Sequence, residues 1–531
     1  MRSKRPRFVA IWSAAVLSGC LFQSASFAAG KAQHIVVVVW DGMRRDFATR
    51  ENAPTLHKLI EEGVFFQNHH PAYPSTTEVN GTTIATGAYP GRSHIVANTE
   101  YRPEIDLQKP VGTESLDAAR KGDLLERGHY VNMPTLAEIL RANGRKTAIA
   151  GAKAVVLLHD RAARMDDTIG VNLYEGRTLP SWARATLTNA LGPFPEAGTN
   201  KTDRDLWTTR ALVEQLWKEG VPPFSLLWLA EPDYSQHNTS PGTEQSLAAI
   251  RSSDRHLTLL LDRLKEKGVY DQTDVFIVSD HGFSTVERGV DLVAALNTNG
   301  FHAARQFKGR PAPGDILVVG GSSVLLYVID HDTKTTERLI HFLQRQDYVG
   351  VLFTRKPFKG TFTLKEAHLD SPEAPDVVFS MRWTNARNPD GIEGAAGAEV
   401  DTAVVDARKE AVAAGRRYGT HGTLSPFDMR NTLVAAGPDF RRGFVNWLPS
   451  GNIDVAPTVL WILGIKPPKP MDGRVLSEAL TIQGPAVGTP KTTRIEATNR
   501  QDNLVWRQYL KRTELNGVIY LDEANGAATP D

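Results

Sequence analysis

The amino-acid sequence predicts an α/β protein with a central, mostly parallel β-sheet and helices on both faces. Apolar segments rich in β-branched residues alternate along the chain with segments of helical periodicity, which is typical of parallel strands joined by helical crossovers. Several of the predicted strands stop at an acidic residue. The chain has 531 residues, of which 41% are hydrophobic and 23% charged, so it can form one large core with insertions or two domains.

The predicted elements begin with HIVVVVW at residues 34–40, a run that indicates a central strand buried on both faces. Helical spacing with a closing glycine follows at 53–64, and a helix–glycine–strand pattern recurs at 133–151. Two more apolar strands, FSLLWLAEPD and DVFIVSDHG, end in acids, and a long helical segment at 247–268 lies between them. NTLVAAGPDF and NIDVAPTVLWILGI then indicate a returning strand and a helix near the end of the core.

We expect the core to span residues 33–480, with insertions near 95–200 and 285–418 and a polar tail at 481–531 whose role the sequence does not indicate. The first insertion has few strand signals beyond TAIAG, and we expect it to form part of a cap. The second insertion has the pattern of a smaller α+β subdomain. Within it, the Gly/Ala-rich stretch at 391–417 predicts a long loop.

The N-terminus has the pattern of an export signal. Basic MRSKRPR precedes the short apolar run FVAIWSAAVL and the small residues of SASFAAG, so residues 1–28 are left out of fold reasoning. Cys20, in LSGC, resembles the lipid-attachment cysteine of a bacterial lipobox, and cleavage after Ala28 is the alternative. Both alternatives predict an exported protein. It would be periplasmic or secreted, and a lipidated Cys20 would anchor it to a membrane. No internal apolar run is long enough to span a membrane.

The charge balance argues against a nucleic-acid-binding protein, and the cysteine count excludes a protein stabilised by internal disulfides. The formal net charge is +1, which argues against a protein that binds nucleic acid by bulk electrostatics and favours a small-molecule partner. The chain has one cysteine, so no disulfide can form within it and stability must come from the core. The sequence leaves the oligomeric state open.

Acids at strand ends and nearby histidines form a candidate metal centre. In open α/β sheets, functional residues lie outside the carboxyl ends of the strands. Each acid alone would be a helix cap or a solvated loop residue, but histidines accompany the acids in EPDYSQH, SDHG and YGTHG. The six residues are Asp41, Asp233, Asp280, His237, His281 and His421. Imidazole nitrogen and carboxylate oxygen in these numbers suit two zinc ions, each with an open position toward substrate.

The motifs VVWDG, PSTTEVNGTTIATGAYP, EPDYSQH, VSDHG and THG carry a resemblance to a known family. With these motifs in this order, the chain resembles the alkaline phosphatase superfamily and, within it, the type I phosphodiesterase/nucleotide pyrophosphatase family. The resemblance runs from about Ile35 to Leu476, with insertions. It implies an alkaline-phosphatase-like sandwich for the core and hydrolysis of a small-molecule phosphoester for the activity.

The resemblance also implies roles for individual residues. Thr77 would be the nucleophile and Asn80 the donor to a phosphoryl oxygen. One zinc would be held by Asp233, His237 and His421, and a second zinc by Asp41, Asp280, His281 and Thr77. A threonine hydroxyl is too weak an acid to attack at neutral pH, and a bound dication lowers the pKa of a coordinated oxygen by many units. The other threonines of this segment are expected to be packing and turn residues.

Two residues, Glu78 and Lys153, bear on the substrate that the resemblance implies. Those members place an aromatic residue after the nucleophile, where this chain has Glu78, an acid that would repel the additional phosphates of a nucleotide. Lys153 follows a predicted strand where phosphonate hydrolases and some monoesterases of the superfamily keep a phosphate-binding lysine, and the alternative is a solvated lysine. Val155, two residues on, leaves no second cation there.

The sequence therefore favours phosphodiester or pyrophosphate-type hydrolysis, with phosphomonoester or phosphonate hydrolysis as the alternative. A diester carries less negative charge than a monoester and needs fewer cations around it. His69 and His70, just before the nucleophile, are expected to be solvated loop residues, with a supporting position behind the site as the alternative.

Overall fold

The computed structural model describes residues 30–161, 170–196, 198 and 200–531. The predicted export signal at 1–28, with Cys20, lies outside the described residues. Within the described ranges, every helix is too short or too polar to cross a bilayer.

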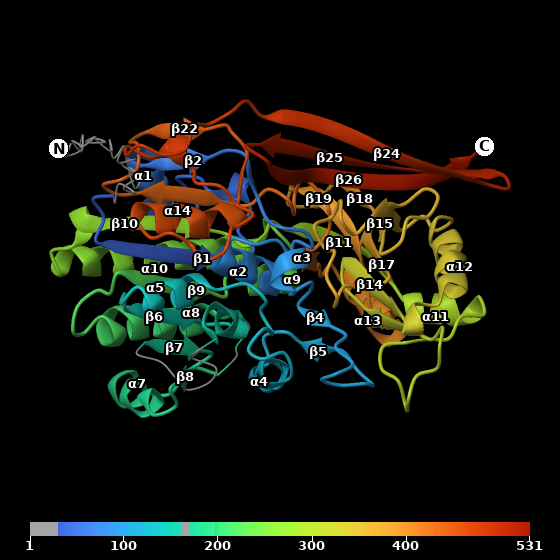
Figure 1. The fold of residues 1–531 in the computed structure, drawn as a ribbon, viewed down its shortest axis with the longest axis horizontal. Helices are drawn as coiled ribbons and strands as arrows, with labels where there is room; N and C mark the ends of the chain where they lie inside the picture. Colours follow the sequence, from blue (N-terminus) through green and yellow to red (C-terminus); the bar gives the residue numbers. More distant parts are fainter. Residues whose placement is uncertain (1–29, 162–169, 197, 199) are drawn as a thin grey trace, which may run out of the picture.

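Nine strands of the described residues form the central sheet (Figure 1). The five inner strands β10, β1, β9, β6 and β7 are parallel to one another, and antiparallel neighbours flank them, β21 beside β10 and β8 beside β7. In spatial order the strands are β22 (Phe444–Asn446), β2 (Val64–Phe66), β21 (Leu433–Ala436), β10 (Thr273–Val278), β1 (His34–Trp40), β9 (Phe224–Leu229), β6 (Thr147–Gly151), β7 (Val171–Tyr174) and β8 (Arg177–Leu179).

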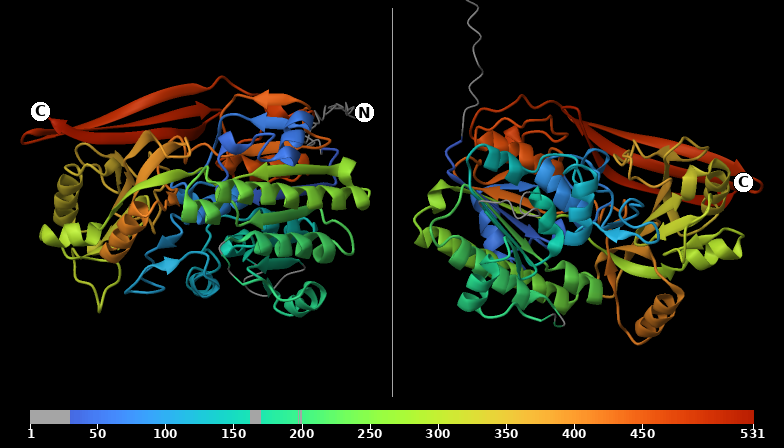
Figure 2. Two further views of the ribbon diagram at one scale, coloured as in Figure 1. Left: turned by 180° about the vertical axis from the view of Figure 1, so that it is seen from behind. Right: turned by 60° about the horizontal axis from the view of Figure 1, so that its bottom comes forward.

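Strand β1 has apolar residues on both sides because each side faces a separate hydrophobic core. Ile35, Val37 and Val39 pack in one core, and Val36 and Val38 pack in the other. The first core includes residues of α2 (Thr77–Thr86), α5 (Leu136–Ala142) and α14 (Val455–Ile462). The second includes residues of α1 (Pro54–Glu62), α8 (Thr202–Arg210) and α10 (Glu244–Glu266). Figures 1 and 2 show these helices on the two faces of the sheet, so the predicted α/β class is confirmed.

Two smaller sheets form the second insertion. One has the order β18 (Trp383–Arg387), β19 (Glu393–Glu399), β11 (Ser284–Val290) and β20 (Gly419–Thr420). The other has the order β12 (Ala303–Ala304), β13 (Ile316–Val319), β14 (Ser323–Val328), β17 (Val377–Met381), β15 (Val349–Thr354) and β16 (Phe362–Thr363). Helices α11 (Leu292–Thr298) and α12 (Thr333–Leu343) accompany this sheet (Figure 1).

The expectation of a long loop at 391–417 is wrong. This stretch forms β19 and α13 (Thr402–Ala413). The small side chains of Ala395, Ala396 and Ala398 are buried, because β19 is an inner strand between β18 and β11. Asp401 starts α13 by accepting a hydrogen bond from the backbone of Val404. Composition alone predicts a loop here, but the alanines and glycines form a closely packed strand.

The segment at 95–200 is divided between the central sheet and the periphery. Strands β6, β7 and β8 join the sheet. The hairpin of β4 (Thr99–Glu100) and β5 (Val111–Gly112), with α4 (Leu116–Leu125) and α7 (Ala183–Leu191), lies outside it (Figure 1). The four residues of β7 and three of β8 are too few to produce a readable strand pattern.

The polar tail forms a third structural unit, a sheet of β24 (Lys491–Gln501), β25 (Leu504–Leu515) and β26 (Val518–Pro530). It lies over the second insertion, as the red strands of Figure 1 show. Leu510 and Leu521 pack in one hydrophobic core with residues of β15. The side-chain amide of Gln508 accepts a hydrogen bond from the backbone of Leu352 (2.9 Å) and donates one back (3.1 Å).

Candidate metal centre and nucleophile

Helix α2 begins at Thr77, and all ten of its residues are buried. The hydroxyls of Thr82, Thr83 and Thr86 donate to backbone carbonyls one helical turn earlier, at 2.7–2.8 Å. This is the packing role expected for them, and it lets a threonine-rich segment form a buried helix. Thr77 is different, because its hydroxyl at the helix N-terminus points toward His281 and Lys153. A helix N-terminus favours bound anions.

The acids converge because they follow neighbouring parallel strands. Asp41 comes directly after β1, Asp280 lies two residues beyond β10, and Asp233 follows β9 at the start of α9 (Asp233–Thr239). His237 lies one turn along α9 from Asp233. His421 follows β20, which pairs with β11 just beyond the His281 segment. The sheet edge thus gathers all six predicted ligands.

Each of the three histidines is oriented by a backbone carbonyl. The Nδ1 atom of His237 lies 3.1 Å from the carbonyl of Gly419, that of His281 lies 2.9 Å from Gly282, and that of His421 lies 2.9 Å from Ser75. Because Nδ1 donates to the carbonyl, Nε2 carries the lone pair and faces the cluster. This is how proteins orient metal-binding imidazoles.

The lone pairs of the histidines face carboxylate oxygens, and that of His281 also lies 3.3 Å from the hydroxyl of Thr77. Nε2 of His237 and of His421 lie 3.3 and 3.6 Å from Oδ1 of Asp233. Nε2 of His281 lies 3.2 Å from Oδ2 of Asp280 and 3.6 Å from Oδ1 of Asp41. These three carboxylate oxygens are buried and have no hydrogen-bond partner. Acceptors facing acceptors are costly in a protein interior, and a cation between them resolves the conflict.

The ligand atoms form two groups that fit metal ions, one of Asp233, His237 and His421 and one of Asp41, Asp233 and His281. The oxygens turned away from the groups are held in place, as Oδ2 of Asp41 accepts from Nε1 of Trp228 at 2.8 Å. Oδ1 of Asp280 accepts from the backbone of Gly42 at 3.0 Å. The nitrogen and oxygen donor set is the one expected for zinc.

The protonation of the centre follows from its burial. Burial lowers the pKa of His281 to about 3, and burial together with His281 lowers the pKa of His421, so both rings are neutral and able to bind a metal. Burial raises the pKa of Asp41 to about 6, and burial with the charge of Asp41 raises the pKa of Asp280. Burial opposes the charge of Asp233 as well, but Lys153 and His237 hold its pKa well below the usual range.

Lys153 lies within the cluster, not in solvent. It follows β6, and its Nζ atom is 2.9 Å from Oδ2 of Asp41, 3.1 Å from Oδ2 of Asp233 and 3.5 Å from Oγ1 of Thr77. Burial opposes its charge, but Asp233 and Asp41 outweigh burial and raise the pKa of the ammonium group. The side chain therefore places a positive charge beside the hydroxyl of Thr77.

Asn80 does not face the site. Its Oδ1 atom accepts from the backbone of Ala72 (2.7 Å) and from Nδ2 of Asn452 (3.0 Å), and its Nδ2 donates to the carbonyls of Ala72 and Thr76, both at 3.1 Å. The amide at the start of α2 is instead that of Asn98, whose Oδ1 accepts from the backbone of Glu78, the residue after Thr77, at 3.2 Å. Spacing along α2 could not reveal this residue, because Asn98 belongs to the loop before β4.

Glu78 pairs with a second acid that the sequence analysis missed. The side chain of Glu78 is 4% exposed and hydrogen-bonds to Glu114, from the loop between β5 and α4. Burial and the proximity of Glu114 raise the pKa of Glu78 well above its ordinary value, against the effect of Lys153. One oxygen of each residue, Oε2, is buried and has no hydrogen-bond partner. The pair therefore presents free acceptor oxygens close to Thr77.

His69 and His70 are buried, so the expectation of solvated loop residues is wrong. They form β3 (His69–His70), which pairs with β23 (Ser450–Gly451). Nε2 of His69 lies 2.9 Å from Oδ1 of Asn452, and the Nδ2 atom of Asn452 donates to the carbonyl of Asp280 at 2.8 Å. Nε2 of His70 lies 3.1 Å from Oδ1 of Asp522 on β26. His69 thus contacts the Asp280 segment through Asn452, and His70 ties the chain before Thr77 to β26.

Comparisons with known proteins identify the family to which this sequence is similar. A family model described as type I phosphodiesterase / nucleotide pyrophosphatase matches residues 35–383. The bovine bis(5'-adenosyl)-triphosphatase ENPP4 is 22% identical over 459 residues, which cover 85% of this chain and 82% of the relative. Bovine ectonucleotide pyrophosphatase/phosphodiesterase family member 3 is 22% identical over 305 residues. That alignment covers 55% of this chain and 30% of the relative, so the chain spans less than a third of that protein.

Solved structures show the same fold. The structure of human ectonucleotide pyrophosphatase / phosphodiesterase 5 matches with a TM-score of 0.60 at 15% identity, over 85% of this chain and 100% of that chain. An inactive murine form of the same enzyme, in complex with AMP, matches with a TM-score of 0.59 at 14% identity, over 85% of this chain and 100% of that chain. The alkaline-phosphatase-like architecture expected from the sequence is confirmed.

Proposed function

The chain belongs to the type I phosphodiesterase / nucleotide pyrophosphatase family, and from its site we propose that it hydrolyses phosphodiesters or pyrophosphate-type bonds with Thr77 as nucleophile and two bound zinc ions. The observation that carries the proposal is the conflict of buried acceptors: three partnerless carboxylate oxygens face three histidine lone pairs beside the Thr77 hydroxyl. Cations between these groups would stabilise the buried carboxylates and the histidine nitrogens that face them.

The ligand sets follow the two groups of atoms. One zinc is assigned to Asp233, His237 and His421, and the other to Asp41, Asp280 and His281 with Thr77, while Asp233 also reaches the second group. The ions supply positive charge that lowers the pKa of a bound hydroxyl and stabilises the charge of the reacting phosphoryl group.

The side chains of the chain itself position the substrate and carry the covalent step. Oγ1 of Thr77 attacks phosphorus, the bond from phosphorus to the leaving-group oxygen breaks, and a phosphothreonine forms. Water then attacks this phosphorus and releases Thr77. The Nδ2 atom of Asn98, on the amide whose Oδ1 accepts from the backbone of Glu78, replaces Asn80 as the proposed donor to a phosphoryl oxygen.

The substrate preference depends on Lys153 and on the acid pair. A diester is favoured because Lys153, with Nζ 2.9 and 3.1 Å from Asp41 and Asp233, is already neutralised by ligand carboxylates. Phosphomonoester or phosphonate hydrolysis is the alternative, since the same ammonium group lies 3.5 Å from Thr77 and could bind an additional negative oxygen. Glu78 and Glu114 favour a substrate whose alcohol side carries a hydroxyl or amine donor, because their free oxygens only accept.

A parallel assay of a bis-aryl phosphate and the matching aryl monoester tests the reaction class. The zinc-loaded wild type is expected to prefer the diester, and Lys153→Ala is expected to keep that preference. A strong monoester preference that collapses in Lys153→Ala would reverse the ranking. Absence of turnover with both esters at full zinc loading would contradict the proposal as a whole.

Cellular location is a separate part of the proposal. The N-terminal pattern supports export, with either a lipidated Cys20 or a free N-terminus at Ala29. Mass spectrometry of the mature N-terminus distinguishes these two forms, and an intact Met1 would contradict export.

A further inference from the structure

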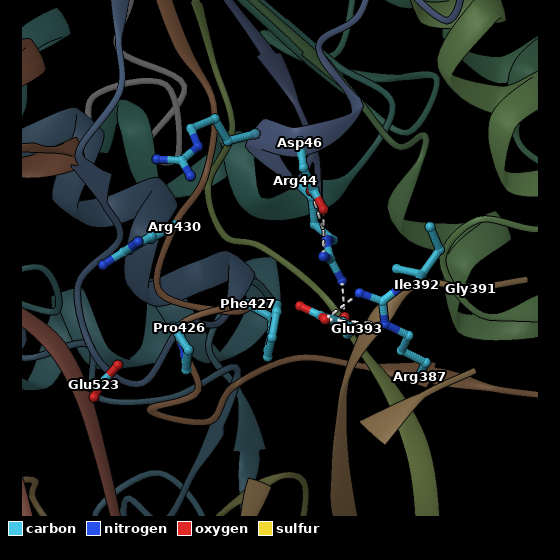
Figure 3. Close-up of a pocket in the computed structure, with 11 residues that line it drawn as sticks. Arg44, Asp46, Arg387, Gly391, Ile392, Glu393, Pro426, Phe427, Arg430 and Glu523 are labelled. Carbon is cyan, nitrogen blue, oxygen red and sulfur yellow. Dashed lines mark hydrogen bonds and ion pairs between the residues drawn. The ribbon is translucent and has the colours of Figure 1, made fainter. Parts of the chain in front are cut away.

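A cavity of about 500 Å³ lies apart from the metal centre and is lined by four arginines, Arg44, Arg45, Arg387 and Arg430 (Figure 3). It opens between the loop after β1 and the segment 426–430. Phe283 separates it from the histidines: the Phe283 ring is 4.9 Å from the ring of His237, and the Phe283 carbonyl accepts a hydrogen bond from Arg44 at 3.2 Å. The cavity is thus a neighbour of the metal centre but not part of it.

Two of the four arginines are fully neutralised. Arg44 forms a two-pronged ion pair with Asp46, at 2.9 and 2.6 Å, and also donates to the carbonyl of Glu393 at 2.8 Å. Arg387 pairs with the carboxylate of Glu393 at 2.7 Å. Figure 3 shows Arg44 and Arg387 converging on Glu393, while Arg430 lies on the other side of Phe427.

The other two arginines, Arg45 and Arg430, form no ion pair within the described part of the chain. Arg45 donates to the backbone carbonyl of Gln67. The Nε atom of Arg430 is buried and has no hydrogen-bond partner. Both guanidinium groups line the same cavity, and burial together with the positive charge of Arg430 lowers the pKa of Arg45, an effect that the charge of Asp46 offsets only in part. Glu523, the remaining acid of the cavity, accepts from the hydroxyl of Tyr509 at 3.4 Å.

Two like charges held together in a partly buried pocket repel each other and favour an anion between them. Guanidinium groups bind phosphate oxygens through paired, charge-assisted hydrogen bonds. The cavity is far larger than an inorganic ion, and Phe427 and Pro426 add flat apolar surface to its wall. We propose that Arg45 and Arg430 form a second anion-binding site, distinct from the metal centre, for a small organic molecule that carries a phosphate group.

Calorimetric titration of the zinc-loaded protein with inorganic phosphate tests the site. We expect two binding events in the wild type, one at the metal centre and one at the cavity. Arg45→Gln and Arg430→Gln are each expected to weaken one event by about tenfold or more, because each removes charge-assisted hydrogen bonds. Competitive inhibition of ester hydrolysis by phosphate should be unchanged in both variants. Arg387→Gln, whose guanidinium is already paired with Glu393, is the matched control and should keep both events.

Two outcomes would overturn the second site: a single binding event in the wild type, or a loss of competitive inhibition in Arg430→Gln. Neither outcome bears on Thr77 or the zinc ligands, so the proposed function would stand. A phosphate-bearing alcohol such as glycerol phosphate should bind the cavity more tightly than inorganic phosphate, and equal affinity would contradict an organic ligand.

Thermal unfolding in a phosphate-free buffer of low ionic strength separates binding from a structural role. If the two guanidinium groups repel, Arg430→Gln should unfold at a higher temperature than the wild type, and added phosphate should reverse the order. A structural Arg430 would instead give a variant with a lower unfolding temperature under both conditions, and this result would contradict the proposal.

Discussion

The two halves of the metal centre differ in how deeply they lie. The inner half (Asp41, Asp280 and His281) is completely inaccessible to solvent. In the outer half (Asp233, His237 and His421), the side chain of His237 is 40% exposed and that of His421 is 9% exposed. Thr77 lies 3.3 Å from His281, on the inner side. Under the proposed mechanism, Thr77 would attack from the closed half, and water and the leaving group would reach phosphorus from the open half.

The groups that hold the candidate ligands in place also differ between the two halves. Side chains deep in the fold hold the inner half, since the indole of Trp228 donates to Asp41 and the amide of Asn452 donates to the carbonyl of Asp280. The outer histidines are held by the backbone carbonyls of Gly419 and Ser75. The inner half is therefore part of the core, whereas the outer half is a feature of loops at its rim.

Thr77→Ala is the strongest test of an inner-side nucleophile. It should lower kcat by at least about a thousandfold, because the covalent step is lost. Zinc content by elemental analysis should stay close to that of the wild type, since Asp41, Asp280 and His281 remain. Thr77→Ser should retain part of the activity, and Thr76→Ala, one residue earlier, is the control. Near-normal turnover by Thr77→Ala would show that the nucleophile is another group.

Removing one histidine from each half tests the difference in depth. His281→Ala should lower the zinc content from about two to about one per chain and also lower the unfolding temperature, because it leaves a cavity and unpaired inner acids. His237→Ala should lose zinc on dialysis while its zinc-free unfolding temperature stays close to that of zinc-free wild type. Equal losses of zinc and of stability in the two variants would contradict the distinction between the halves.

Asn98 and Asn80 provide a matched pair for the donor beside Thr77. Asn98→Ala should lower kcat/KM by about a hundredfold with little change in stability, as expected for the loss of one donor to the reacting oxygens. Asn80→Ala should lower the free energy of unfolding by about 2 kcal/mol or more, because it leaves backbone groups of buried residues unpaired. If Asn80→Ala reduced kcat/KM as strongly as Asn98→Ala while remaining stable, the assignment of the donor would be reversed.

The smallest expected effect concerns acid stability behind the inner half. Burial lowers the pKa of His69 from 6.5 to about 3, so between these values the unfolded chain binds a proton that the folded chain does not. Its contribution to stability is complete above about pH 6.5 and is lost as the pH falls toward 3, at up to about 1.4 kcal/mol per pH unit.

Urea denaturation across this pH range measures the effect. His69→Gln should lose less stability on acidification than the wild type, whatever its stability at neutral pH. The control is His302→Gln, since the side chain of His302 is 86% exposed. An unchanged pH dependence in His69→Gln would show that His69 is protonated in the folded state.

The sequence was sufficient for features that depend on local pattern. The buried strand at 34–40, the acids at the strand ends and the histidine that follows Asp233 by one helical turn are all readable from spacing, and the structure brings them together. The sequence was not sufficient where contacts between distant parts of the chain determine the position of a residue. Asn98 and Glu114 reach Glu78, next to Thr77, only through the chain path around the β4–β5 hairpin, which no spacing predicts.

Burial was misjudged for the same reason. His69 and His70 have the composition of a loop, but pairing of β3 with β23 encloses them. The stretch at 391–417 has small residues that indicate flexibility when they are solvated and close packing when they lie between two strands. Which of these applies depends on neighbours from distant parts of the chain.

The contact between His70 and Asp522 has a consequence for folding. The two residues are 452 positions apart in the sequence, and Asp522 on β26 also accepts from the hydroxyl of Thr513 at 2.8 Å, so its carboxylate supports the segment before Thr77 only after β25 and β26 have formed. Closing so long a loop of chain is entropically costly, and contacts of this kind slow folding. We therefore expect the segment before Thr77 to gain this support late in folding, after the three-stranded sheet has docked.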